Sequence, residues 1–97
     1  MVVVSRRAIR SFCTHSPELE TALDKWYKES RKADWASFSA LRQTFNATDS
    51  VGNGLFVFNI GGNKCRLVAR IFFRKRTLYI RFIGTHKQYD ELDLSTL

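Results

Sequence analysis

Apolar side chains alternate with polar or charged ones along two consecutive stretches of the chain, residues 63–74 and residues 77–85. Because successive side chains of a strand point to opposite faces of a sheet, this period of two predicts two neighbouring β-strands. The face predicted to enter the core carries Cys65, Leu67, Ala69, Ile71 and Phe73, then Leu78, Ile80 and Phe82. The opposite face carries Lys64, Arg66, Val68, Arg70, Phe72 and Arg74, then Tyr79, Arg81, Ile83 and Thr85. The pattern therefore predicts a sheet with one apolar face and one mainly cationic face.

Two dipeptides, Asn53-Gly54 and Gly61-Gly62, are typical of tight hairpin turns, because such turns need positive φ angles that Asn and Gly tolerate. If Gly61-Gly62 and Lys75-Arg76 are two-residue loops, both turns place the basic residues on one face. The predicted cross-strand pairs are Asn59–Lys64, Val57–Arg66, Arg74–Thr77, Phe72–Tyr79, Arg70–Arg81 and Arg66–Thr85. The agreement between the two turns favours an antiparallel sheet in this register.

The first 45 residues show helical signals instead. The β-branched run Val2-Val3-Val4 predicts a short opening strand, followed by a helix from about residue 6 to residue 14. Ser16-Pro17 is a helix start signal, and apolar residues recur at helical spacing from there to about Lys32. A third, short helical segment is expected near residues 37–42. The sequence therefore predicts helices in the first half of the chain and strands in the second half.

The chain has 97 residues and carries sixteen Lys and Arg against nine Asp and Glu, a net charge of +7. Its length fits one domain, residues 1–97. An excess of positive charge favours polyanionic partners, which leaves RNA, DNA, an anionic membrane or an acidic protein open. No apolar run approaches the roughly 20 residues that cross a bilayer, and no signal-peptide core is present, so we expect a cytoplasmic protein without a membrane partner.

The two cysteines, Cys13 and Cys65, are far apart and have no Cys/His spacing of the kind that holds a metal. We expect two reduced thiols, no metal site and no cofactor. Cys65 alternates in phase with Leu67 and Ala69, which predicts a small buried side chain.

The predicted pair Arg70–Arg81 indicates an anion site. Like charges directly across two strands repel each other, and a bound phosphate would relieve that repulsion. Tyr79 and Phe72, beside the cations, would offer rings for base stacking. The alternative is a solvated sheet face, or arginines paired with acidic residues of a helix.

His86 directly follows the last predicted strand, and Tyr89 lies three residues further on. A histidine can transfer protons near neutral pH, although many histidines are only exposed and many tyrosines belong to the core. Together with cations, such a pair suits RNA cleavage by the neighbouring 2′-hydroxyl: a base takes its proton, cations stabilise the phosphorane and an acid protonates the leaving 5′-oxygen. This chemistry needs no metal.

Three segments form one spaced pattern. They are Phe58-Asn59-Ile60-Gly61-Gly62-Asn63-Lys64, then Arg66-Leu67-Val68, then residues 80–90 with Ile80-Arg81-Phe82 and Gly84-Thr85-His86-Lys87-Gln88-Tyr89-Asp90. With Asp24-Lys25-Trp26-Tyr27 and Ala33-Asp34-Trp35, this pattern resembles the HigB-type toxins of the RelE-like superfamily over nearly the whole chain. The resemblance implies an α+β, RelE-like fold and an mRNA interferase that cuts messenger RNA, typically on the translating ribosome. It also implies a HigA-like helix-turn-helix antitoxin as partner.

Carried over to this sequence, the resemblance makes His86 the acid or base and Tyr89 a residue that orients the substrate or assists proton transfer. Arg66, Arg70 and Arg81 would hold the scissile phosphate. Asn59, Asn63, Lys64, Arg74 and Tyr79 are the further RNA-binding candidates. Some members of the superfamily use a glutamate as base, which has no match in this sheet, so the identity of the base stays open.

Two alternatives to an endoribonuclease remain at this point. One is a non-enzymatic binding module of the same superfold that acts on RNA or on another target such as gyrase. The other is a basic domain whose arginines only bind an acidic partner.

Overall fold

A five-stranded sheet in the order β1-β5-β4-β3-β2 organises the computed structural model, which describes residues 1–97. Its strands are β1 (Val2–Val4), β2 (Asp49–Ser50), β3 (Leu55–Ile60), β4 (Cys65–Phe72) and β5 (Thr77–Thr85). The neighbours β2 to β5 are antiparallel, as predicted, whereas β1 runs parallel to β5. The sheet is therefore mixed. The alternation pattern of the later strands could not reveal the direction of the short opening strand.

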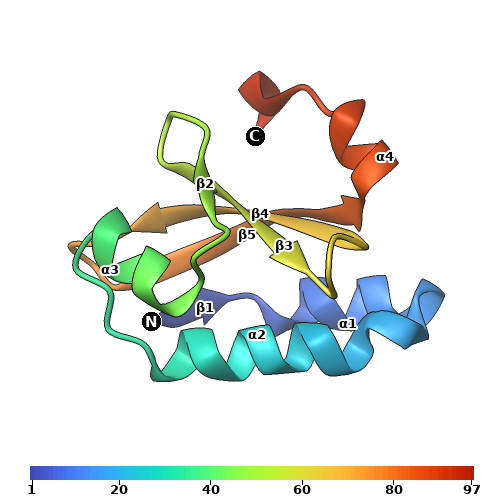
Figure 1. Ribbon diagram of the computed structural model, residues 1–97, viewed down its shortest axis with the longest axis horizontal. Helices are drawn as coiled ribbons and strands as arrows, with labels where there is room; N and C mark the ends of the chain where they lie inside the picture. The colour runs from blue at the N-terminus through green and yellow to red at the C-terminus, as the bar shows by residue number, and fades with distance from the viewer.

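The long helices α1 (Arg6–His15) and α2 (Glu20–Lys32) lie together on one side of the sheet (Figure 1). The start signal at Ser16-Pro17 forms a short 3-10 helix, η1 (Pro17–Leu19), which leads into α2. The helix α3 (Phe38–Thr44) begins at Ser37, whose side chain accepts a hydrogen bond from the Ala40 N–H. The α+β prediction with N-terminal helices is confirmed. None of the helices has the length and hydrophobicity of a transmembrane span.

The main core fills the space between the helices and the sheet. Leu23 and Trp26 of α2 and Ile9 of α1 are buried there against the predicted core face of β4. Trp26 meets Phe58 of β3 edge to face, with ring centroids 5.2 Å apart. Cys65 is fully buried in this cluster, which confirms its predicted place.

The end of the chain crosses the opposite face of the sheet. After α4 (His86–Asp90), a segment that includes the 3-10 helix η2 (Leu94–Thr96) covers the middle of that face (Figure 1). Its apolar side chains pack on a second, smaller cluster made of Leu55, Val57 and Val68. The face predicted to be mainly cationic is thus divided into an end near α4, a covered middle and an uncovered end near β1.

The predicted register is wrong by two residues at both turns. The β3–β4 turn has four residues, so that Ile60 pairs with Cys65 and Asn59 pairs with Arg66. The β4–β5 turn also has four residues, so that Phe72 pairs with Thr77 and Arg70 pairs with Tyr79. Asn63 and Arg76 take positive φ angles of 77° and 51°, which lengthens both turns. A shift of two residues keeps each side chain on its predicted face.

A β-bulge then changes the facing of the last strand. The register shifts between Val68 and Ala69, whose partners are Phe82 and Ile80, so Arg81 has no partner across the ladder. One extra residue reverses the alternation. Phe82 therefore packs in the second cluster and Ile83 against the main core, the reverse of the prediction. The predicted pair Arg70–Arg81 does not form.

Candidate active site

The helix α4 is fixed to the end of β5 by a capping box. The Thr85 hydroxyl accepts a hydrogen bond from the Gln88 N–H at 3.1 Å, and the Gln88 amide oxygen accepts one from the Thr85 N–H at 2.9 Å. These two bonds satisfy backbone donors that a helix start leaves without a partner. Gly84 precedes them, and a Cβ at that position would lie 2.7 Å from the Gln88 amide oxygen. The sequence Gly84-Thr85-His86 thus sets where α4 begins.

His86 is the first residue of this helix and is exposed. Its Nδ1 lies 3.1 Å from Oδ2 of Asp90, one helical turn further along. When Nδ1–H donates to the carboxylate, the proton stays on that nitrogen and Nε2 is left as a free acceptor. In this tautomer Nε2 has the form that a general base needs.

Arg66 of β4 lies beneath α4. Its guanidinium carbon is 5.5 Å from the centroid of the Tyr89 ring, a cation–π contact that joins the sheet to the helix. Arg66 is half-buried, and its Nε is buried without a hydrogen-bond partner. A buried donor of this kind costs free energy until an acceptor meets it. The site therefore has a positioned cation with an unsatisfied N–H.

Asn59 of β3 is the direct neighbour of Arg66 across the ladder and is exposed. Asn63 and Lys64 are exposed in the turn that follows. The register thus brings these three predicted RNA-binding residues to the same end of the sheet as Arg66 and α4.

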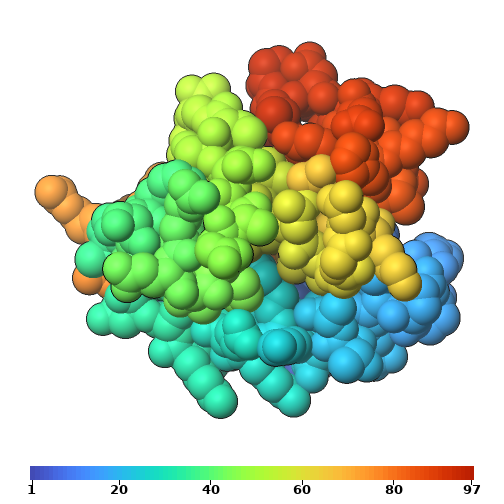
Figure 2. Space-filling model, viewed as in Figure 1, coloured from blue at the N-terminus to red at the C-terminus, as the bar shows by residue number.

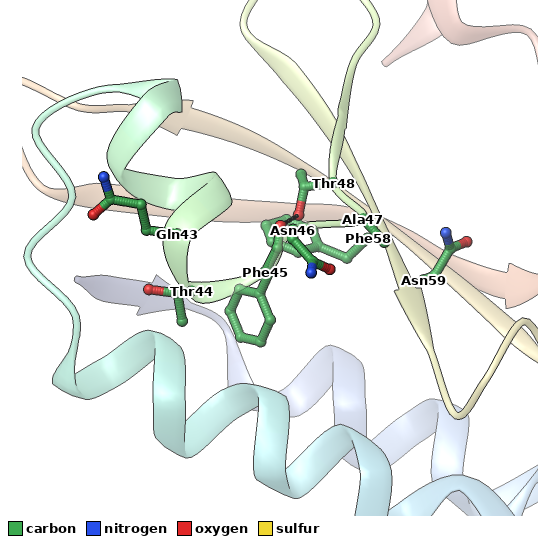
Figure 3. Close-up of a pocket in the computed structure, with 8 residues that line it drawn as sticks. All are labelled: Gln43, Thr44, Phe45, Asn46, Ala47, Thr48, Phe58 and Asn59. Carbon is green, nitrogen blue, oxygen red and sulfur yellow. Dashed lines mark hydrogen bonds between the residues drawn. The ribbon is translucent and has the colours of Figure 1, made fainter.

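A hollow of about 250 Å³ lies next to Asn59, between β3 and α3 (Figure 3). Besides Asn59 its walls are Gln43, Thr44, Phe45, Asn46, Ala47, Thr48 and Phe58. None of these side chains can exchange a proton near neutral pH. The side chains that suit acid–base chemistry, His86 and Tyr89, lie instead on α4.

Arg70 is engaged elsewhere, although it lies on the same face as Arg66. Its Nη2 donates to the carbonyl oxygen of Leu97 at 3.0 Å, and its Nη1 donates to the carbonyl of Asn53. It ties the end of the chain to the β2–β3 turn. The structure therefore gives the Arg70 guanidinium a structural task, in contrast to the predicted phosphate contact.

The other predicted residues lie further along the sheet. Tyr79 pairs with Arg70, four residues along β4 from Arg66, or roughly 13 Å at the rise of a strand. Arg74 is exposed in the β4–β5 turn. This turn projects at the end of the molecule opposite α4 (Figure 2). Arg81, in the bulge, is exposed beside α1 in a hollow that Phe12 and His15 also line. The structure does not bring Arg81, Tyr79 or Arg74 to Arg66.

Sequence reasoning did not assign a role to Asp90 or Gln88. Both follow from short spacings that were available in the sequence. His86-x-x-x-Asp90 places two side chains one turn apart on a helix, and Thr85-x-x-Gln88 is the spacing of a capping box.

Comparison with known proteins identifies the family of this chain. The family described as HigB toxin, the RelE-like toxic component of a toxin–antitoxin system, matches residues 19–92. The mRNA interferase toxin HigB of Escherichia coli K12 is 30% identical over 92 residues, which cover 93% of this chain and 88% of that protein. The mRNA interferase HigB of Escherichia coli CFT073 is 26% identical over 94 residues, which cover 95% and 91%.

The family match extends from α2 through α4, and so it includes Arg66, His86, Tyr89 and Asp90. The resemblance inferred from the sequence motifs is confirmed. This chain belongs to the HigB toxin family, the RelE-like toxic components of toxin–antitoxin systems.

Proposed function

We propose that this toxin is an mRNA interferase, an endoribonuclease that cuts messenger RNA at the site formed by Arg66, His86 and Tyr89. The observation that carries the proposal is the half-buried Arg66, whose Nε lacks a partner directly beneath the helix that presents His86. A phosphate oxygen is the acceptor that best suits a guanidinium donor. The family and the name mRNA interferase of its relatives give the reaction class.

The proposed reaction needs only groups of this chain and of the RNA. The 2′-oxygen attacks the adjacent phosphorus while a base takes its proton, and the bond from phosphorus to the 5′-oxygen breaks. An acid protonates that oxygen, so the products are a 2′,3′-cyclic phosphate and a 5′-hydroxyl. Arg66 would stabilise the negative charge that develops on the phosphorane. His86 would take or give the proton through Nε2 while Asp90 holds the ring.

The remaining residues have supporting roles in this proposal. The Tyr89 ring lies against the Arg66 guanidinium, and Tyr89 would orient the substrate or assist proton transfer. Asn59, Asn63 and Lys64 would bind the RNA on one side of the scissile phosphate. Arg81 is a candidate for a more distant phosphate contact from the edge of the sheet.

The test replaces His86 or Arg66 by Ala and maps the ends of a reporter mRNA by primer extension. Each variant should lose about 100-fold or more of the cleavage rate while its thermal unfolding remains cooperative. His15→Ala is the matched control, because His15 is the other exposed histidine and is the last residue of α1, outside α4. Wild-type rates in both variants would refute the site. Toxicity without cut mRNA in the wild-type protein would refute the reaction.

The variant Arg81→Ala tests whether Arg81 and Arg66 have different roles in cleavage. Because the bulge removes Arg81 from the ladder beside Arg66, its loss should reduce cleavage less than Arg66→Ala does. Equal losses would mean that Arg81 also reaches the scissile phosphate.

We further infer that the toxin acts on translating ribosomes in the cytoplasm and is neutralised by a HigA-like helix-turn-helix antitoxin. The net charge of +7 favours both an rRNA-rich target and an acidic partner. Cleavage assays with and without ribosomes test the first point. Co-expression with the product of the neighbouring reading frame tests the second, because growth should recover.

A further inference from the structure

The uncovered end of the second sheet face carries an apolar patch made of Val2, Val4, Phe72 and Tyr79. Their side chains are 57%, 40%, 44% and 40% exposed, and they are the exposed large hydrophobic residues of this chain. The register places all four together. Val4 pairs with Tyr79, and Val2 and Phe72 are both partners of Thr77. Single exposed apolar residues are ordinary, whereas a contiguous group marks an interaction surface.

We propose that this patch binds an acidic segment of the antitoxin that presents apolar side chains to it. This inference rests on the proposed function, which supplies the antitoxin as partner. It goes further by assigning the surface and the chemistry of the segment that meets it.

The charge around the patch favours an acidic partner. Residues 1–17 and 65–89, which include β1, β4 and β5, contain no Asp or Glu. Arg74 and Lys75 are exposed in the adjoining turn and form no ion pair, whereas Arg76 is paired with Asp34 at 2.6 Å. A second copy of this chain would bring the same cations against the patch, and the two copies would repel each other.

The chemistry of the patch favours a polypeptide over RNA. Bases stack on the open faces of aromatic rings. Here the planes of Phe72 and Tyr79 meet at 86°, and the Lys75 ammonium lies 5.9 Å from the centroid of Phe72. The other half of the patch is formed by two valines, which offer no ring. Aliphatic and edge-to-face aromatic surfaces pack well against apolar side chains of a protein.

The patch is separate from the proposed active site, and this separation makes the inference testable. Tyr79 lies four ladder positions from Arg66 along β4, and the covered middle of the sheet face begins at Arg70, which holds the carbonyl of Leu97. Changes in the patch should therefore weaken antitoxin binding without changing RNA cleavage by the free toxin.

The experiment titrates the purified product of the neighbouring reading frame into the full-length toxin by calorimetry. The variant with both Val2→Thr and Val4→Thr keeps β-branched side chains in β1 but removes apolar surface from the patch. Its dissociation constant should rise about tenfold or more. Lys75→Glu should weaken binding about tenfold, whereas Lys32→Glu, an equal charge change on α2, should leave it within about twofold.

Wild-type affinity in both patch variants would overturn the inference while leaving the proposed function intact. Loss of mRNA cleavage in the patch variants with unchanged antitoxin affinity would overturn it in favour of an RNA surface. A wild-type dimer that the patch variants dissociate would overturn it in favour of a second copy. If the wild-type toxin does not bind the product of the neighbouring reading frame, both the proposed partner and this surface are overturned. If that toxin still cuts mRNA, the proposed reaction stands.

Discussion

The imidazole of His86 and the carboxylate of Asp90 face each other across one turn of α4, with 3.1 Å between Nδ1 and Oδ2. Both side chains are partly exposed, so their mutual attraction adds little to stability. What the contact does is select the orientation and tautomer of the ring. We therefore expect the pair to matter for the proposed reaction more than for the fold.

Asp90 is predicted to act as a positioning residue through His86. Asp90→Ala should lower kcat for mRNA cleavage about 10- to 100-fold and leave KM nearly unchanged, because RNA binding does not use this carboxylate. The variant with both Asp90→Ala and His86→Ala should be no slower than His86→Ala alone. Glu91→Ala, the neighbouring exposed acid, is the control and should keep wild-type kcat. Additive losses in the double variant would show that Asp90 acts independently of the histidine.

Gly84 is predicted to be required for the placement of α4. A Cβ there would lie 2.5 Å from Cζ of Phe82 and 2.7 Å from the Gln88 amide oxygen. Gly84→Ala should therefore lower the free energy of unfolding by about 1–3 kcal/mol and reduce cleavage, because the capping box must shift. Gly62→Ala is the control: it adds the strain of a φ of +61° without a nearby atom, so it should cost about 1–2 kcal/mol but spare the cleavage rate. Equal activity of the two variants would contradict the role given to Gly84.

The strands β3 to β5 and, as far as the bulge in β5, their faces could be predicted from the sequence, because alternation depends only on local side-chain direction. Cys65, Leu67 and Ile71 are buried as the pattern indicates. The register could not be predicted, because it depends on turn length. Asn63 and Arg76 lie in the two longer turns and have positive φ angles. Arginine seldom adopts such an angle, so the sequence gives no sign that Arg76 does. The bulge at Arg81 likewise has no recognisable signal in the sequence.

The candidate site was predictable where its residues adjoin a recognisable strand end, as His86 and Tyr89 do. The contacts of Arg70 could not be predicted, because its partners are backbone carbonyls of Asn53 and Leu97. Every residue has a carbonyl, so composition and motif spacing cannot reveal such a contact. The covering of the sheet face by the end of the chain was missed for a related reason. Its three leucines are too few and too irregularly spaced to show a period.

Arg70 is accordingly predicted to stabilise the protein. Arg70→Ala removes the two hydrogen bonds that tie Leu97 and the β2–β3 turn to β4, and the free energy of unfolding in urea should fall by about 1–3 kcal/mol. Amide hydrogens of the segment after α4 should exchange faster, because this tie no longer holds the segment. Arg74→Ala, an exposed arginine without a partner, should change stability by less than about 0.5 kcal/mol. Unchanged stability of Arg70→Ala, together with lost cleavage, would restore the phosphate contact predicted from the sequence.

Cys65 is predicted to make the fold sensitive to alkaline pH. Burial raises the pKa of the Cys65 thiol from its ordinary value of 9.0 to about 11. Below pH 9 the thiol is protonated in both the folded and the unfolded chain, so it has no effect on the pH dependence of stability. Between the two pKa values the unfolded chain binds fewer protons than the folded one, and stability therefore falls as the pH rises. The total loss should be on the order of 2 kcal/mol.

Urea unfolding between about pH 8.5 and pH 10.5 measures this loss as a slope. Cys65→Ala will be less stable at neutral pH, because it leaves a cavity, but its stability should decline less steeply with pH than that of the wild-type protein. Cys13→Ala is the control, since Cys13 is only half-buried. This variant should retain most of the wild-type dependence of stability on pH. Because tyrosines and lysines also titrate in this range, the difference between the slopes is decisive. Equal slopes for the wild-type protein and Cys65→Ala would mean that the buried thiol does not ionise on unfolding in this range.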